Sequence, residues 1–219
     1  MRLPPDPIYA DSSNSKQVGA PAFLWLLVGV MALIEIVLSA SDSGLIGATE
    51  WRLVAYKHGA FWQPLFSGAV AQIFPGQTVS MFVTHAFLHG GLTHLLLNCV
   101  ILLALGKTVS EKVGPGKTLM ILLASAIAGA AVFGFISSSN APMIGASGAV
   151  FGLLGVWQIW DYQLRRRMGA PIQPFLGSIL ALVLANVLIF LLLAGGLAWE
   201  AHLGGWIAGA LAAATFARK

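Results

Sequence analysis

The chain has 219 residues, of which 58% are hydrophobic and only 9% are charged. A soluble domain carries about 25% charged residues, so this composition excludes a water-exposed globular domain and predicts a polytopic membrane protein. The net charge of +4 bears on membrane topology rather than on nucleic acid, which we do not expect as a partner. The single cysteine, Cys99, excludes an internal disulfide.

The chain divides into a polar N-terminal tail and one membrane domain. Residues 1–20 contain three prolines and predict a flexible cytoplasmic tail rather than a cleaved signal peptide. Residues 21–219 predict a single all-α domain, in which six apolar segments are expected to cross the roughly 30 Å hydrocarbon core as helices. These segments are 21–40, 81–105, 118–137, 146–162, 175–195 and 199–217.

Basic residues fall mainly on one face of this six-span arrangement. Ten of the twelve lie in the tail, in the connections after the second and fourth spans, and at the end of the chain, whereas Arg52 and Lys57 lie on the other face. The positive-inside rule therefore places both termini in the cytoplasm. This distribution and the short tails favour a multi-pass protein of a bacterial inner membrane.

The long connection 41–80 is expected on the outer face. It is rich in aromatic residues and poor in charges, which favours a segment lying partly in the membrane interface. An ordinary soluble loop is the alternative.

Four polar residues inside the spans need an explanation because the bilayer penalises them. Ser147, His202 and His94 lie about 21, 24 and 20 Å from the charges that end their spans, and Asn98 lies about 14 Å from them, at 1.5 Å per helical residue. A hydroxyl, two imidazoles and an amide are thus predicted near one depth. They would form either a catalytic site or unrelated helix–helix hydrogen bonds.

Small residues offer a way to bring Ser147 and His202 together. The fourth span carries Gly148 and Gly152, and the sixth carries small residues at the same four-residue spacing (Ala201, Gly205 and Gly209). Such stripes let two helix backbones approach closely, so a histidine base could reach a serine hydroxyl. The serine also lies at a glycine-flanked helix start, where free N–H groups can stabilise an oxyanion, although an incidental N-cap serine would look the same.

His94 and Asn98 are spaced i, i+4, so both can donate to a developing negative oxygen. A metal site formed by His94 with His85 and His89 is an alternative, but carboxylates and further thiols are missing nearby, so we expect no metal and no cofactor. His85 and His89 are more simply explained as partners of the loop 41–80.

No acidic residue completes a triad. Glu200 points away from His202 around the helix, Asp161 lies far below it, and Glu35 is a buried acid without an obvious partner. The residues therefore predict a Ser–His dyad, with chemistry slower than that of a full triad.

Three separated motifs resemble those of the rhomboid family of intramembrane serine proteases. They are HGGLTHLLLN (His89 to Asn98), GASG (Gly145 to Gly148) and AHxxG (Ala201 to Gly205). Together, in this order and on these spans, they are highly specific, and the resemblance covers roughly residues 80–210.

The resemblance implies a six-helix fold in which Ser147 is the nucleophile and His202 the general base. It implies an oxyanion hole made by His94, Asn98 and the N–H of Ser147, with Gly145 shaping the motif backbone. The substrates it implies are transmembrane segments of other proteins, cut near the outer membrane surface. The fifth span, which contains Asn186, would help to admit them.

The chain departs from the family in two places. Many relatives have a tyrosine stacked on the histidine where this chain has Phe151, which keeps the aromatic face but loses the hydroxyl. Many also carry Trp-Arg just before the second span, whereas Trp51-Arg52 lies about thirty residues earlier here.

A catalytically silent relative that binds transmembrane helices is the runner-up function. A transporter would predict paired charges and repeated halves, which the sequence does not show.

Overall fold

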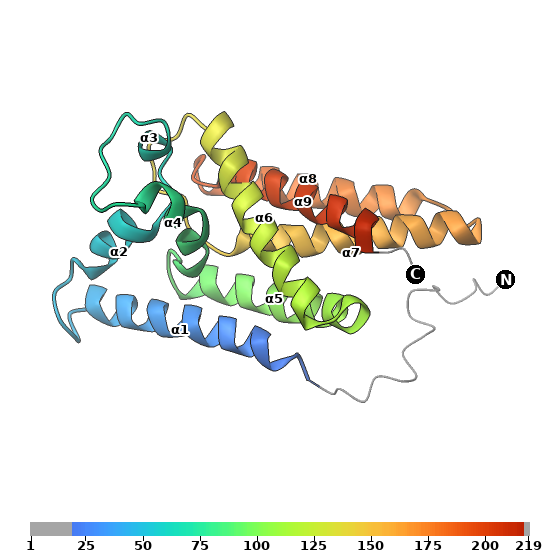
Figure 1. Cartoon of the computed structure of the whole chain (residues 1–219), viewed down its shortest axis with the longest axis horizontal. Helices are drawn as coiled ribbons and strands as arrows, with labels where there is room; N and C mark the ends of the chain where they lie inside the picture. The colour runs from blue at the N-terminus through green and yellow to red at the C-terminus, as the bar shows by residue number, and fades with distance from the viewer. Residues whose placement is uncertain (1–18, 217–219) are drawn as a thin grey trace.

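A computed structural model describes residues 19–216, in which every regular element is a helix (Figure 1). Six helices are long: α1 (Ala22–Asp42), α5 (Leu92–Val113), α6 (Pro115–Ile136), α7 (Ser147–Met168), α8 (Gln173–Leu192) and α9 (Trp199–Phe216). Between α1 and α5 lie four short ones: α2 (Trp51–Gly59), α3 (Gln63–Phe66), α4 (Gln77–Thr84) and the 3-10 helix η1 (His85–Phe87). The all-helical prediction is confirmed for this part of the chain, and nearly all of the predicted tail 1–20 lies outside it.

Four of the described helices are long and apolar enough to cross a membrane, namely α1, α5, α6 and α8. The helices α7 and α9 are of similar length but carry more glycine and polar residues along their faces. Their polar character matches their place in the bundle, because they pack against each other and against α6 more extensively than any other pair of elements.

The second span begins later than the sequence predicted. We expected a helix over 81–105, but the chain forms the end of α4 and a 3-10 turn, and α5 starts only at Leu92 and continues to Val113. The reason lies at Gly91, whose backbone has a φ of +125°. Residues other than glycine rarely adopt this conformation. His85 and His89 therefore precede α5 and do not share a helix face.

The long helices alternate in direction along the bundle (Figure 1). The helices α5, α7 and α9 start at the end of the molecule where α2, α3 and α4 lie, and α1, α6 and α8 run the opposite way. The first two turns of α5 and the first turns of α7 and α9 are therefore gathered at one end, and these turns carry the polar residues singled out in the sequence.

The helices α7 and α9 touch backbone to backbone. A Cβ added at Gly205 would collide with the carbonyl group of Gly148, and one added at Gly209 would collide with that of Gly152. On the other side, a Cβ on Gly129 of α6 would lie 2.7 Å from the carbonyl oxygen of Ala201. The predicted close approach of the fourth and sixth spans is confirmed.

The helix α8 is the least embedded of the long helices, since none of its residues is buried. A polar chain ties its first half to the bundle: Gln158 Nε2 donates to Ser178 Oγ at 3.2 Å, and Trp206 Nε1 donates to Gln158 Oε1 at 2.6 Å. A second polar contact lies farther along the helix, at Asn186.

The connection between α1 and α5 packs onto the bundle. Phe61 is fully buried, makes edge contacts with Phe82 and Phe133, and forms a β-bridge with Met143 in the segment before α7. The expected interfacial aromatic segment is thus partly a second hydrophobic core, which holds this connection next to the start of α7.

Candidate active site

Ser147 is the first residue of α7 and is half-buried. The turn before it depends on Gly145, whose φ is +111° and whose N–H donates to the His85 carbonyl oxygen at 2.9 Å. Because the first N–H groups of a helix have no partner within it, the backbone around Ser147 offers donors beside the hydroxyl.

His94 and Asn98 lie directly against this turn. A Cβ placed on Gly145 would be 2.8 Å from Nε2 of His94 and 3.8 Å from Nδ2 of Asn98. The N–H of Gly90 donates to His94 Nδ1 at 3.3 Å, so the proton of the neutral ring resides on Nε2, the atom that faces the turn. Asn98 Nδ2 donates to the His94 carbonyl at 3.0 Å, which leaves its second amide hydrogen available.

His202 lies in the first turn of α9 and is buried, with 8% of its surface exposed. Phe151, one turn after Ser147 on α7, stacks on the imidazole with ring centroids 4.0 Å apart and an interplanar angle of 11°. The aromatic ring of Phe151, expected from the sequence to face the histidine, is therefore in contact with His202.

Ser147 and His202 lie on the two helices that approach most closely. Their neighbours meet, since a Cβ on Gly148 would lie 3.4 Å from the Ala201 carbonyl oxygen. Within residues 19–216, however, the Ser147 hydroxyl makes no hydrogen bond to His202. Catalytic hydrogen bonds of enzymes without substrate are often long and tighten when substrate binds, so the dyad stays a prediction.

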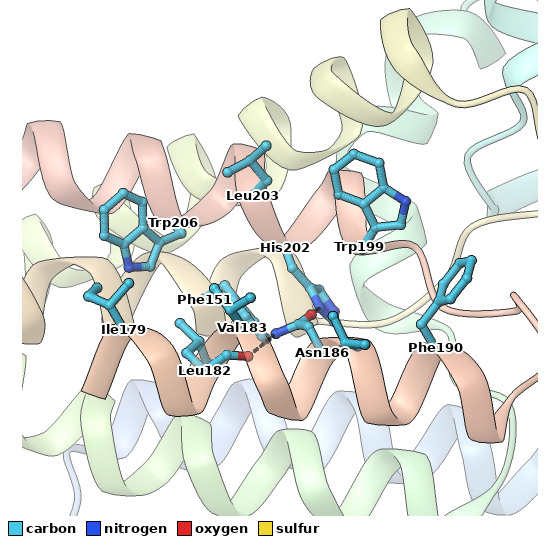
Figure 2. Close-up of a pocket in the computed structure, with 11 residues that line it drawn as sticks. Phe151, Ile179, Leu182, Val183, Asn186, Phe190, Trp199, His202, Leu203 and Trp206 are labelled. Carbon is cyan, nitrogen blue, oxygen red and sulfur yellow. Dashed lines mark hydrogen bonds between the residues drawn. The ribbon is translucent and has the colours of Figure 1, made fainter. Parts of the chain in front are cut away.

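The imidazole has a polar contact that the sequence did not reveal. His202 Nδ1 lies 2.6 Å from Oδ1 of Asn186 on α8 (Figure 2). Both side chains border a cavity of about 490 Å³ between α8 and α9, whose other walls are apolar or aromatic. The signal in the sequence was an amide in the middle of a mainly apolar helix, but its angular position relative to His202 could not be read from spacing.

His85 and His89 lie before α5, outside the group formed by Ser147, His202, His94 and Asn98. His85 Nδ1 is 2.9 Å from the Met81 carbonyl oxygen, and its ring meets Phe61 of the outer connection edge-on. His89 is fully buried and packs edge to face against His94, with ring centroids 5.1 Å apart. The described residues contain no group of three His, Cys, Asp or Glu side chains that could hold a metal ion.

Glu35 forms a buried ion pair with Arg52, a partner that the sequence did not reveal. Its two carboxylate oxygens accept from Arg52 at 2.8 and 3.0 Å, and this bonding raises the pKa of Arg52 above its ordinary value. Arg52 also donates to the carbonyl oxygen of His89 at 2.8 Å, as does the hydroxyl of Tyr56. The pair thus connects α1 and α2 to the chain just before α5, where His94 lies.

Comparison with known proteins identifies the family of the chain. The rhomboid domain family matches residues 76–219, about two thirds of the chain. The chain is 30% identical over 205 residues to "Rhomboid protease GluP" of Bacillus subtilis (strain 168), covering 90% of this chain and 35% of that protein. It is 30% identical over 153 residues to "Rhomboid-like protease 3" of Toxoplasma gondii, covering 66% of this chain and 54% of that protein.

A third relative is "Rhomboid protease GlpG" of Yersinia pestis (strain Pestoides F), 26% identical over 194 residues, which covers 88% of this chain and 62% of that protein. The chain therefore spans between about a third and three fifths of the length of these relatives. The family match covers all three motifs and the long helices α5 to α9. This chain is an integral membrane protein and belongs to the rhomboid family.

Proposed function

We propose that this protein is an intramembrane serine protease in which Ser147 is the nucleophile and His202 the general base. The observation that carries the proposal is the turn Gly145–Ser147, which lies against His94 Nε2 and Asn98 on one side while α7 meets the helix of His202 on the other. A hydroxyl, a base and two side-chain donors then surround one point at the same end of the bundle.

The chemistry follows from these groups. His202 Nε2 takes the proton of Ser147 as Oγ attacks the scissile carbonyl carbon, forming a tetrahedral oxyanion. Collapse of this intermediate breaks the C–N bond, and the imidazolium returns its proton to the leaving amine. Water, activated by the same base, then releases the acyl group from Ser147.

The oxyanion is stabilised by three donors: the N–H of Ser147, Nε2–H of His94 and the free amide hydrogen of Asn98. These donors are fixed before the reaction by the turn and by the first two turns of α5, so little reorganisation is needed as charge develops. Gly145 is required because any side chain there would displace His94.

The topology that accompanies this function has six spans, α1 and α5 to α9, and both termini in the cytoplasm. Lys107, Lys112, Lys117 and Arg165–Arg167 lie at the ends of α5, α6 and α7 that face away from the site, as cytoplasmic residues should. Ser147 then lies toward the outer surface, and the substrates are transmembrane segments of proteins in the same membrane, for which a bacterial inner membrane is our proposal.

The test is cleavage of reporter transmembrane substrates in liposomes. We expect Ser147→Ala and His202→Ala to abolish cleavage, whereas the exposed outer-connection variants Ser43→Ala and His58→Ala retain it. A fluorophosphonate probe should label the intact protein and its Ser43→Ala variant but not Ser147→Ala. Cleavage that survives both dyad substitutions would contradict the proposal. Binding of several substrates without cleavage or labelling would favour the catalytically silent relative.

A further inference from the structure

The general base proposed above is held at two places by two different helices. Phe151 of α7 covers the face of the His202 ring, and Asn186 of α8 meets its edge at Nδ1, 2.6 Å away (Figure 2). The face contact fixes the plane of the ring but is equally compatible with both ring flips about the Cβ–Cγ bond. The edge contact selects the flip in which Nδ1 faces Asn186 and leaves Nε2 as the nitrogen without this bond.

The direction of the edge hydrogen bond follows from the asparagine. Asn186 Nδ2 donates to the carbonyl oxygen of Leu182 at 2.9 Å, which fixes the amide so that Oδ1 faces the imidazole. An amide oxygen can only accept, so His202 Nδ1 must carry the hydrogen and donate it. The neutral ring is then the Nδ1–H tautomer, with its lone pair on Nε2. This is the tautomer that can accept the proton of a serine nucleophile.

We propose that Asn186 is the positioning residue of the catalytic histidine and takes the place of the carboxylate in a Ser–His–Asp triad; this inference rests on the proposed protease function. Its amide oxygen selects the Nδ1–H tautomer of His202 and stabilises the imidazolium formed when Ser147 loses its proton. Cysteine proteases of the papain type pair a histidine with an asparagine in the same way. No charge needs to be buried in the membrane for this purpose, which the bilayer would penalise.

A purely structural role for Asn186 would be to hold α8 against the bundle. The structure supplies a matched comparison, because Ser178 makes the other described side-chain hydrogen bond between α8 and the bundle, to Gln158 of α7. Ser178 and Asn186 are both half-buried on α8, and only Asn186 touches the histidine. A loss specific to Asn186 therefore reports on the base rather than on the docking of α8.

The experiment compares Asn186→Leu, Asn186→Asp and Ser178→Ala with the intact protein in liposomes. Kinetics of reporter cleavage and the rate of fluorophosphonate labelling measure activation of Ser147, and 15N spectra of labelled histidine measure the tautomer of His202. We expect Asn186→Leu to lower kcat and the labelling rate roughly tenfold to hundredfold, with KM within about twofold, and to lose the Nδ1–H tautomer. Asn186→Asp keeps an acceptor and should recover most of the rate, and Ser178→Ala should change it less than about twofold.

Two results would overturn the inference. One is an Asn186→Leu variant that cleaves at the original rate and keeps the Nδ1–H tautomer. The other is an equal loss of rate in Ser178→Ala, which would reduce Asn186 to an anchor of α8. Failure of the protease proposal looks different: the intact protein would neither cleave nor be labelled, while the spectra would still report whether Asn186 sets the tautomer.

Discussion

Phe151 lies flat on the imidazole of His202, with ring centroids 4.0 Å apart and planes within 11° of parallel. An aromatic pair of this kind contributes about 0.5–1.5 kcal/mol beyond simple burial. The contact involves only the ring face, so the hydroxyl that a tyrosine would add at this position is not part of it.

We therefore expect Phe151→Tyr to cleave within about twofold of the original rate and Phe151→Leu to lose roughly two- to tenfold in kcat, with KM unchanged. Leucine retains apolar volume but not a flat face, so the loss reports on orientation of the base. Steady-state cleavage of a reporter measures it, with the exposed Phe135→Leu as the control. A Phe151→Leu enzyme as fast as the original would show that the stacking does not matter.

His94 and Asn98 give the second prediction. If both donate to the oxyanion, His94→Ala and Asn98→Ala should each lower kcat about 10²- to 10³-fold and leave KM nearly unchanged, because the donors act mainly in the transition state. Thr93→Ala, on the exposed face of the same helical turn, is the matched control. A rise in KM at constant kcat would mean instead that these side chains bind the ground state of the substrate.

The third prediction concerns the contact between α7 and α9. Gly205→Ala pushes a methyl group into the backbone of Gly148, and overpacking of this kind costs about 1–3 kcal/mol. Gly177→Ala is the control, since the space around Gly177 on α8 is open and alanine is the better helix former by up to about 1 kcal/mol. Thermal unfolding in detergent should rank Gly205→Ala below the original protein and Gly177→Ala at or above it; the reverse order would refute close packing at Gly205.

The buried ion pair gives the fourth prediction. The Glu35 side chain is fully buried and that of Arg52 is 18% exposed, so Glu35→Met leaves a partly buried guanidinium without its main partner. Loss of one member of such a pair costs about 3–5 kcal/mol, and partial exposure places this case at the lower end. The double variant Glu35→Met/Arg52→Met should be more stable than Glu35→Met alone.

Asp42→Asn serves as its control, because Asp42 is 40% exposed and its bond to Arg52 should contribute no more than about 1 kcal/mol. Unfolding of the original protein, Glu35→Met, Arg52→Met and the double variant in one detergent completes a double-mutant cycle. Strictly additive effects of the Glu35 and Arg52 substitutions would argue against an energetic coupling between them.

The sequence predicted those features of the bundle that depend on composition and residue spacing. The all-helical class, the glycine contact between α7 and α9, and the gathering of His94, Asn98 and the Ser147 turn at one end follow from apolar length and four-residue repeats. The predicted start of the second span was wrong by eleven residues. An apolar stretch does not reveal that the positive φ of Gly91 keeps the helix from beginning before Leu92.

Two side-chain partnerships could not be predicted for a related reason. Glu35 meets Arg52 across seventeen residues, and His202 meets Asn186 across sixteen, in both cases between different helices. Which face of α8 turns toward α9 depends on tertiary packing, and α8 is apolar on all sides, so its amphipathic pattern gave no direction. The polar residues themselves were visible, but their partners required the structure.

The absence of any buried residue on α8 has a consequence for how freely this helix can be redesigned. Packing constrains a sequence only where neighbours exclude other shapes, and most of the α8 surface has no such neighbours. A generic polyleucine segment that keeps Ser178 and Asn186 in register should therefore replace α8 without loss of the fold. The helix would then serve mainly to hold the Asn186 amide in place, and its positions other than Ser178 and Asn186 would tolerate leucine.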